Sequence, residues 1–270
     1  MKKISFLAVA SMVGASLFFA SCGSKGVSQE STSLAFDSIV VDTATQVING
    51  ADTLKATVHI SLPLAQGEGA DAVNDSILSS GVLAEDFMPK DIAGLTAEQK
   101  VRAFAKNFLD NYRKDCEEAI KEGIAGASFQ YSYDVTGKVE ENAADSLVNV
   151  EMTGYVFLGG AHGTSISLAR NFNKATGAMV GKADLLTAEG EKEVPKLICG
   201  DLQKQFGAKD LDELKEKGLF MMGDAYVPNN FLVKSDSITF IYQSDEMAPH
   251  AIGEVRATLG KKDLSKYLKK

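Results

Sequence analysis

The chain has no tryptophan, and it has only three histidines and three cysteines among its 270 residues. Sugar-binding surfaces usually stack the sugar ring on tryptophan or tyrosine, so the missing tryptophan disfavours a lectin. The common catalytic and metal-binding signatures are also missing, among them HExxH, GxxxxGK[ST], GxSxG, CxxC and the EF-hand loop. The sequence therefore predicts no metal site and no cofactor.

Basic residues are fewer than acidic ones, with 28 Lys and Arg against 36 Asp and Glu. The formal net charge of −8 becomes −10 (−8 − 2) if Lys2 and Lys3 are removed with an N-terminal signal. An acidic surface disfavours binding to nucleic acid or to membranes through a basic patch. It agrees with plain solubility, and it also suits a cationic partner.

The longest apolar run lies at the N-terminus, from Ile4 to Phe19, directly after two lysines. A charged start followed by a run too short to span a bilayer is typical of a secretory signal. The run ends in Phe-Ala-Ser-Cys, which resembles a lipobox, so we expect a signal peptide over residues 1–21 and a lipid on Cys22. Residues 22–33 read as a polar, flexible tether. The protein is then exported and anchored to the outer membrane, on its periplasmic or its surface face; the alternative is a secreted protein with a chance cysteine.

Two further cysteines, Cys116 and Cys199, lie in segments with helical patterns and apolar neighbours. In an oxidising compartment they could form one disulfide, and their surroundings equally suit two separate buried thiols. Neither lies near a histidine in the sequence, so a catalytic role is not expected.

Hydrophobic periodicity predicts an α+β fold, with antiparallel sheets and packed helices, because strands follow one another in runs with helices between them. The clearest element is a helix that begins after Thr96, has Gln99 in a capping box and ends at Gly123. Pro63 is expected to end the second strand. Strands are expected near 33–44, 52–65, 130–157, 164–173, 230–243 and 254–260, and further helices near 71–88, 191–207 and 261–270.

The expected organisation is a two-module ectodomain. An N-terminal α+β module would cover residues 34–130, and a second module would cover residues 131–270. The charged, then apolar, stretch DELKEKGLFMM within the second module fits no element firmly.

The most unusual segment is Gly154–Ser165, GYVFLGGAHGTS, which lies between two alternating strands. A tight link between antiparallel strands needs positive φ angles, which would explain Gly159, Gly160 and Gly163. The histidine between them, His162, is not explained by geometry. It either hydrogen-bonds nearby backbone within the turn or contacts a ligand or partner.

A second unusual segment, EMAPHAIG, precedes the last strand. Pro249 prevents regular ladder bonding and Gly253 permits a bend, so the chain must loop out there. Asp245 and Glu246 place two carboxylates on this loop. Adjacent residues of an extended segment point to opposite faces, which is poor geometry for a pair of catalytic acids.

Together these segments resemble a domain family of unknown function found in bacterial exported proteins. The first motif is GGAHG followed by a strand, Asn171-Phe172-Asn173 and a Thr-Gly turn. The second is a Y-E-I-A-P-Y-A-x-G signature, read here over Asp245–Gly253. The matching residues are Glu246, Ala248, Pro249, Ala251 and Gly253, whereas Asp245 and His250 replace two tyrosines of the family.

The family resembled forms the extracellular, lysozyme-sensing part of anti-sigma factors and accompanies some peptidoglycan deacetylase domains. The resemblance implies a non-catalytic, lipid-anchored envelope protein that binds a cell-wall component such as peptidoglycan, or a secreted cationic protein such as lysozyme. The alternatives are a cell-wall hydrolase or deacetylase-like enzyme that uses His162, His250, Asp245 and Glu246, and a structural or inhibitory subunit of an envelope assembly. The candidate partner-binding residues are Gly159, Gly160, His162, Gly163, Asp245, Glu246, Pro249 and His250.

Overall fold

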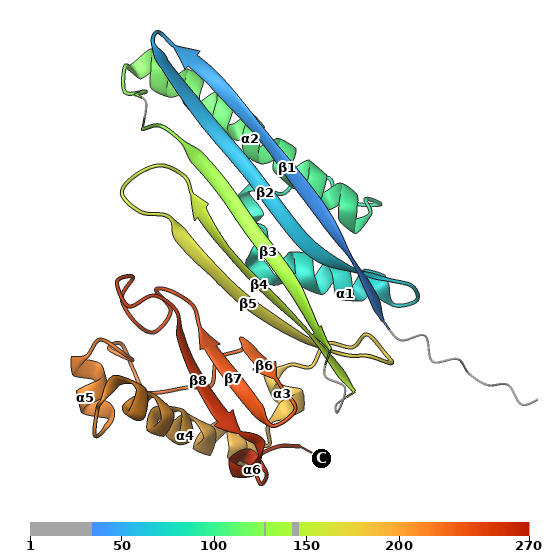
Figure 1. Cartoon of the computed structure of the whole chain (residues 1–270), viewed down its shortest axis with the longest axis vertical. Helices are drawn as coiled ribbons and strands as arrows, with labels where there is room; N and C mark the ends of the chain where they lie inside the picture. Colours follow the sequence, from blue (N-terminus) through green and yellow to red (C-terminus); the bar gives the residue numbers. More distant parts are fainter. Residues whose placement is uncertain (1–33, 127, 142–145, 270) are drawn as a thin grey trace, which may run out of the picture. The chain divides into compact units, whose positions relative to one another are not determined.

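A computed structural model describes residues 34–126, 128–141 and 146–269 (Figure 1). The expected signal peptide, the lipid site Cys22 and the tether 22–33 lie outside these residues. Within the described ranges, none of the helices has the length and apolar character needed to cross a membrane.

The first half of the described chain forms a five-stranded sheet with its strands in sequence order. Neighbouring strands are antiparallel except β2 and β3, which run parallel. The segment between these two strands contains two helices and provides the crossover that a parallel pair needs. The expected α+β class, with mainly antiparallel sheets, is confirmed. The strands are β1 (Ala35–Asn49), β2 (Asp52–Gln66), β3 (Tyr131–Glu141), β4 (Leu147–Phe157) and β5 (Thr164–Asn173).

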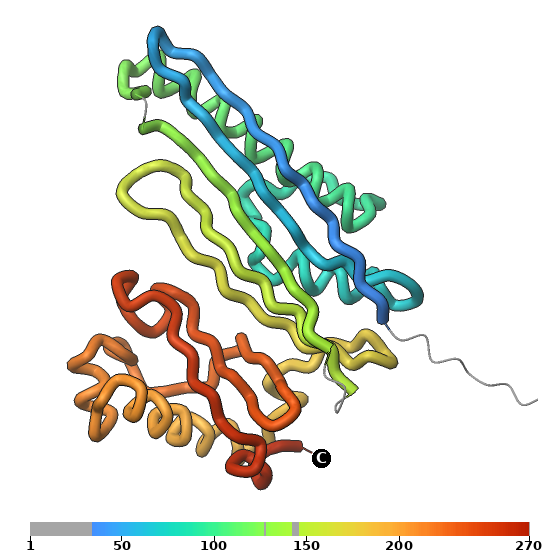
Figure 2. Tube along the Cα trace, in the orientation of Figure 1, coloured from blue at the N-terminus to red at the C-terminus, as the bar shows by residue number. Residues whose placement is uncertain are grey.

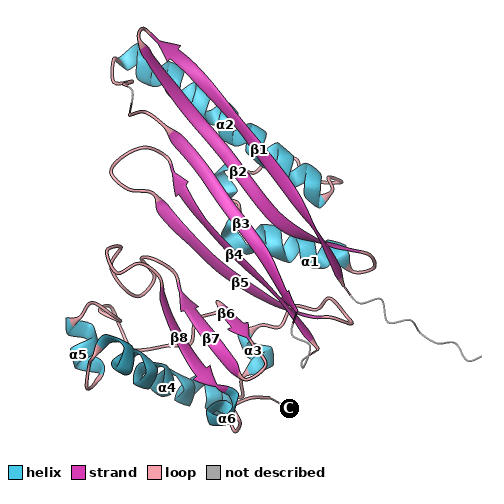
Figure 3. Cartoon of the chain, viewed as in Figure 1, coloured by secondary structure: helices cyan, strands magenta, loops and turns pink. Residues whose placement is uncertain are grey.

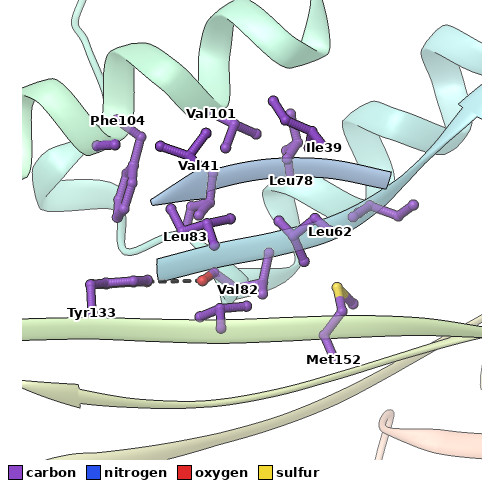
Figure 4. Packing of buried hydrophobic residues seen from close by; sticks show 14 of the residues in the cluster. Ile39, Val41, Leu62, Leu78, Val82, Leu83, Val101, Phe104, Tyr133 and Met152 are labelled. Atoms are coloured by element: carbon purple, nitrogen blue, oxygen red, sulfur yellow. Dashed lines mark hydrogen bonds between the residues drawn. The ribbon is translucent and has the colours of Figure 1, made fainter. Parts of the chain in front are cut away.

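Helices α1 (Ala70–Ile77) and α2 (Ala97–Glu122) pack on one face of this sheet (Figure 3). A π-helical turn, η1 (Leu78–Val82), and a 3₁₀ turn, η2 (Glu85–Phe87), connect them. Inward-facing side chains of the strands meet the apolar faces of the helices in one hydrophobic cluster (Figure 4). Within it the Tyr133 hydroxyl donates to the Val82 carbonyl at 2.8 Å, and burial raises the pKa of Tyr133 to about 12.

Helix α2 has the boundaries that its capping residues predict. The Thr96 hydroxyl accepts from the Gln99 amide at 3.2 Å, and the Gln99 side chain accepts from the Thr96 amide at 2.9 Å. Gly123 ends the helix with φ +71°. These reciprocal bonds satisfy donors that the first turn of a helix leaves without partners.

The last third of the chain forms a second sheet with its own hydrophobic cluster. Its antiparallel strands are β6 (Phe231–Val233), β7 (Ser237–Tyr242) and β8 (Val255–Gly260). Helix α4 packs against β8. The helices of this part are α3 (Lys182–Leu185), α4 (Ala188–Phe206), α5 (Leu211–Glu216) and α6 (Lys261–Leu264).

Two expectations about chain organisation differ from the structure. A module boundary at residue 130 would fall inside one sheet, because β3 pairs with β2. The two hydrophobic clusters divide the chain between Phe172 and Leu186 instead. The second strand also continues past Pro63 to Gln66. Proline is tolerated there because β3 pairs with β2 only as far as Ser61, so no hydrogen bond to β3 is lost.

Cys116 and Cys199 are both free and buried, the first in the cluster under the five-stranded sheet and the second in the cluster of the smaller sheet. Of the two alternatives that the sequence left open, the structure has the separate thiols. Burial raises the pKa of each thiol, which disfavours the reactive thiolate.

Asparagine side chains join the two sheets. The Asn171 amide nitrogen donates to the Phe231 carbonyl at 2.8 Å, and its oxygen accepts from the Val233 amide at 2.9 Å. The Asn230 side chain bonds the backbone of β5 in the same way, with an Nδ2 to Ser167 carbonyl distance of 2.7 Å. These side chains supply the hydrogen bonds that a further strand would otherwise make with β5 and β6.

A buried carboxylate lies at the same junction. The Glu151 side chain on β4 is only 7% exposed, and it pairs with Lys138 at 3.0 Å and with Arg256 of β8 at 2.7 Å. Burial raises the pKa of Glu151, but the hydrogen bonds and charges of its two basic partners outweigh burial and hold the pKa below its usual value.

Candidate functional site

The turn 158–163 joins β4 to β5, and its glycines have two different explanations. Gly159 and Gly160 have φ angles of +83° and +87°, as predicted for a tight link. Gly163 has no positive φ, so that part of the prediction is wrong. Its amide instead donates to the Tyr155 hydroxyl at 2.9 Å, and a Cβ at this position would collide with the tyrosine ring.

The two histidines of the unusual motifs meet in space. The ring centroids of His162 and His250 are 5.5 Å apart, although 88 positions (250 − 162) separate them in the chain. The turn 158–163 and the β7–β8 loop therefore lie side by side, as the yellow and red tubes of Figure 2 indicate. Both side chains are exposed.

The adjacent acids bind different groups. Asp245 has a φ of +67°, and its Oδ2 lies 2.8 Å from Nδ1 of His250. Glu246 points elsewhere: one oxygen accepts from the Tyr226 hydroxyl at 2.9 Å and the other from the Gln243 amide at 2.9 Å. The structure thus brings His162, His250 and Asp245 together and turns Glu246 away from them.

Beside this cluster lies a cleft of about 480 Å³. Ligand pockets of proteins commonly have volumes of roughly 300–1,000 Å³. All three charged side chains of its lining are acidic, and the rest are apolar, aromatic or glycine. The lining residues are Gly218, Phe220, Met221, Met222, Gly223, Asp224, Tyr226, Asp245, Glu246, Met247, Ala248 and Pro249.

Three aromatic rings support one side of the cleft. Phe220, Tyr226 and Tyr242 pack edge to face, with ring centroids 5.3–6.2 Å apart. The Tyr242 hydroxyl donates to the Tyr226 carbonyl, which ties this segment to β7. Burial, and then the hydrogen bond to Glu246, raise the pKa of Tyr226 above its usual value, so its phenol stays protonated and donates to the carboxylate.

Unusual backbone angles also concentrate here. Among the described residues other than glycine, positive φ angles occur at Phe220 (+54°) and Asp245 (+67°), and both line the cleft. The Phe220 amide donates to the Met247 carbonyl at 2.8 Å, which holds the two walls together. Sparsely populated conformations persist where surrounding contacts enforce them, and they often occur at binding sites.

The rim of the cleft exposes large apolar side chains. Met222 is fully exposed at 100%, Met221 is 58% exposed and Tyr226 is 38% exposed. Leu158, in the neighbouring turn 158–163, is 44% exposed. A gathering of exposed apolar groups with polar residues around them is typical of an interaction surface.

The segment 218–226 is the part of this site that sequence analysis missed. Its residues 218–222 belong to the stretch DELKEKGLFMM that fitted no expected element, and the fold of the segment depends on contacts with the β7–β8 loop. One local signal was present: four apolar residues, Leu219–Met222, stand between two glycines without the alternation of a strand. In the structure the first two residues of this run are buried and the two methionines are exposed.

In the described part of the chain no group of three or more His, Cys, Asp or Glu side chains is placed to hold a metal ion. His59 lies on β2, away from the cleft lining, with its Nδ1 at 3.8 Å from Asp42 and its side chain 43% exposed.

The segment that forms the second sheet is similar to a known protein family. Residues 183–262 match the model of DUF3298, a protein family of unknown function. This segment includes α4, the strands β6–β8 and both walls of the cleft. Over these residues the chain is similar to the DUF3298 family. The turn 158–163 lies before the matched segment, and so do all five strands of the larger sheet.

Two solved structures have a similar fold over most of the chain. A DUF3298 family member from Bacteroides fragilis aligns with a TM-score of 0.72 and 21% identity, covering 88% of this chain and 95% of that one. A DUF3298 family protein from Pseudomonas aeruginosa aligns with a TM-score of 0.58 and 16% identity, covering 87% and 95%. No curated protein matched the chain. Both alignments extend well beyond the matched segment 183–262, so the similarity in fold includes the larger sheet.

Proposed function

We propose that the chain is a non-catalytic, lipid-anchored protein of the bacterial envelope that captures a secreted cationic protein such as lysozyme. The binding surface consists of the turn 158–163, the segment 218–226 and the loop 243–250, together called the three-loop surface. The observation that carries the proposal is the acidic, apolar-rimmed cleft at its centre. The lipid at Cys22 would hold this surface at the outer membrane.

The composition of the surface favours a protein partner. Exposed methionines and a half-exposed tyrosine offer adaptable apolar contacts, and protein interfaces are enriched in these residue types. Carboxylates attract basic partners and raise the rate of association at low salt. The net charge of −8 adds a long-range field of the same sign.

The test is calorimetric titration of the purified protein with hen lysozyme at two salt concentrations. We expect binding that weakens as salt rises, because exposed charges are screened. Met222→Ala should weaken binding by about tenfold, the loss typical of a central interface side chain. Met179→Ala is the matched control, since Met179 is 49% exposed but lies outside the cleft lining.

The absence of lysozyme binding at both salt concentrations would refute the proposal. Peptidoglycan fragments are titrated in parallel, and binding to fragments alone would replace the protein partner with a cell-wall component. Equal losses in the Met222 and Met179 variants would remove the three-loop surface from the interface.

A second candidate is an enzyme acting on the cell wall, favoured by the 2.8 Å contact between Asp245 and His250 with His162 beside it. A carboxylate that orients an imidazole is the arrangement of a general base. This candidate predicts that the protein releases sugar, peptide or acetate from peptidoglycan, and that His250→Ala abolishes the release. The divergence of Glu246 from this cluster disfavours a glycosidase with two cooperating acids.

A further inference from the structure

We infer that the cleft receives one arginine or lysine side chain of the partner protein, with the aliphatic stem on the methionines and the cationic head at the carboxylates. This inference rests on the proposed function, and it names the group of the partner that enters the cleft. The occupant is argued from the charge, the aromatic wall and the shape of the cleft.

The charge of the cleft selects a cation. Asp224, Asp245 and Glu246 contribute three carboxylates, and the lining contains no lysine or arginine. Asp245 already contacts His250, and Glu246 accepts hydrogen bonds from the uncharged Tyr226 hydroxyl and the Gln243 amide. Glu246 and Asp224 therefore keep negative charge that no basic side chain of the lining neutralises. An anion or a neutral sugar would leave these charges uncompensated.

The other groups of the lining suit the rest of a basic side chain. The face of an aromatic ring attracts a guanidinium or ammonium group, and Tyr226 presents a ring that is 38% exposed. Long basic side chains bury their methylene stems on apolar surface while the head stays polar. Met221 and Met222 provide such a surface at the mouth. A single side chain thereby satisfies the charged and the apolar parts together.

The cleft is also held in its shape before binding. The Phe220 amide bond to the Met247 carbonyl and the Tyr226 hydroxyl bond to Glu246 fix the two walls against each other. A preformed site loses little conformational entropy when it binds. This supports entry of a side chain into an existing cleft.

The test uses methionine methyl groups as reporters. The purified protein carries ¹³C-methyl methionine, and Met221, Met222 and Met247 report on the cleft, while Met88, Met152 and Met179 lie outside its lining. The probe is the blocked peptide Gly-Arg-Gly, and its citrulline analogue is the neutral control of nearly equal shape. We expect arginine peptide to shift only the cleft methyl signals and citrulline peptide to shift none.

Charge variants locate the contact. Asp224→Asn should weaken lysozyme binding by about tenfold, as expected for loss of a charge-assisted hydrogen bond. Glu118→Gln removes the same charge from an exposed position on α2 and should leave binding unchanged. Glu246→Gln should weaken binding too, but it also disturbs bonds within the loop, so Asp224→Asn is the deciding variant.

The inference and the proposed function fail in different ways. If lysozyme binds but both peptides leave the cleft signals unchanged, and Asp224→Asn binds normally, the inference is wrong and the proposed function stands. If the arginine peptide shifts the cleft signals but lysozyme does not bind, the proposed function fails while the selection of a basic side chain by the cleft stands. Equal shifts from arginine and citrulline peptides would overturn the inference, because charge would then play no part.

Discussion

Replacing Asn171 with leucine tests whether asparagine side chains hold the smaller sheet to the larger one. Asn171 is 2% exposed, and its side chain makes one hydrogen bond as donor and one as acceptor to the backbone of β6. Leucine has a similar size but cannot form a hydrogen bond as donor or as acceptor. The Phe231 carbonyl and the Val233 amide, both on buried residues, would lose their partners.

The expected loss follows from these two groups. A buried polar group left without a partner destabilises a protein by about 1–3 kcal/mol. Two such groups lower the free energy of unfolding by about 2–6 kcal/mol, which is a large part of the roughly 5–15 kcal/mol of a typical domain. β6 has only three residues and pairs with β7 alone in its sheet, so little else compensates.

Asn149→Leu is the matched comparison. Asn149 is equally buried and lies opposite Asn171 in the sheet, but it makes one hydrogen bond, to the Val233 carbonyl at 2.8 Å, and its Oδ1 has no partner. Its replacement should therefore destabilise the protein by about 1–3 kcal/mol, less than the Asn171 change. Urea unfolding followed by circular dichroism measures both. An Asn171→Leu protein within about 0.5 kcal/mol of the parent, a change usual at ordinary surface positions, would refute the role of the side chain as a substitute for strand pairing.

Three further changes test local features. Gly163→Ala should lower the free energy of unfolding by about 1–3 kcal/mol because the new methyl collides with the Tyr155 ring and with the Val156 carbonyl. A Tyr155→Ala background should relieve only the part of this loss that comes from the ring. The pKa of Glu151 is lower in the folded than in the unfolded protein, so Glu151 contributes stability that is present above its unfolded pKa and is lost as the pH falls through its folded pKa. Glu151→Gln should therefore flatten the acid limb of a curve of unfolding free energy against pH, and an unchanged limb would contradict this. Thr96→Ala should cost about 1 kcal/mol in urea unfolding through loss of the cap, and no change would contradict the capping box.

Much of the fold could be predicted because its signals are local. The cap at Thr96, the glycine at 123 and the stripe of apolar residues between them determine α2 within one segment. The β6–β7 hairpin and the bend at Gly253 are similarly local. In contrast, the parallel pairing of β2 with β3 joins segments separated by two helices. No pattern within either strand indicates which neighbour it will have, and so the expected boundary at residue 130 falls between two strands that pair.

The candidate site likewise has residues that could be predicted from the sequence and residues that could not. The histidines, the two acids and Pro249 stood out because each is an unusual residue in an otherwise regular stretch. The explanation for Gly163 was wrong because the Tyr155 ring that crowds it is eight positions away and reaches it only after the strands pair. Contacts of this kind form only when the chain folds, and no regular residue spacing in the sequence indicates them.

The cleft shows most clearly why a site cannot always be predicted from the sequence of the segments that line it. β7 and β8 pair over Tyr242 and Val255, which fixes both ends of the loop between them, and Glu246 then bonds the Gln243 amide within it. The second wall takes its shape from the first, since Phe220 holds its positive φ while its amide bonds Met247. Leu219 and Phe220 are buried, whereas Met221 and Met222 after them are exposed, in a segment held by a loop that follows it by more than twenty residues. The cleft is therefore formed by contacts within the chain itself, and a site formed in advance loses less entropy on binding.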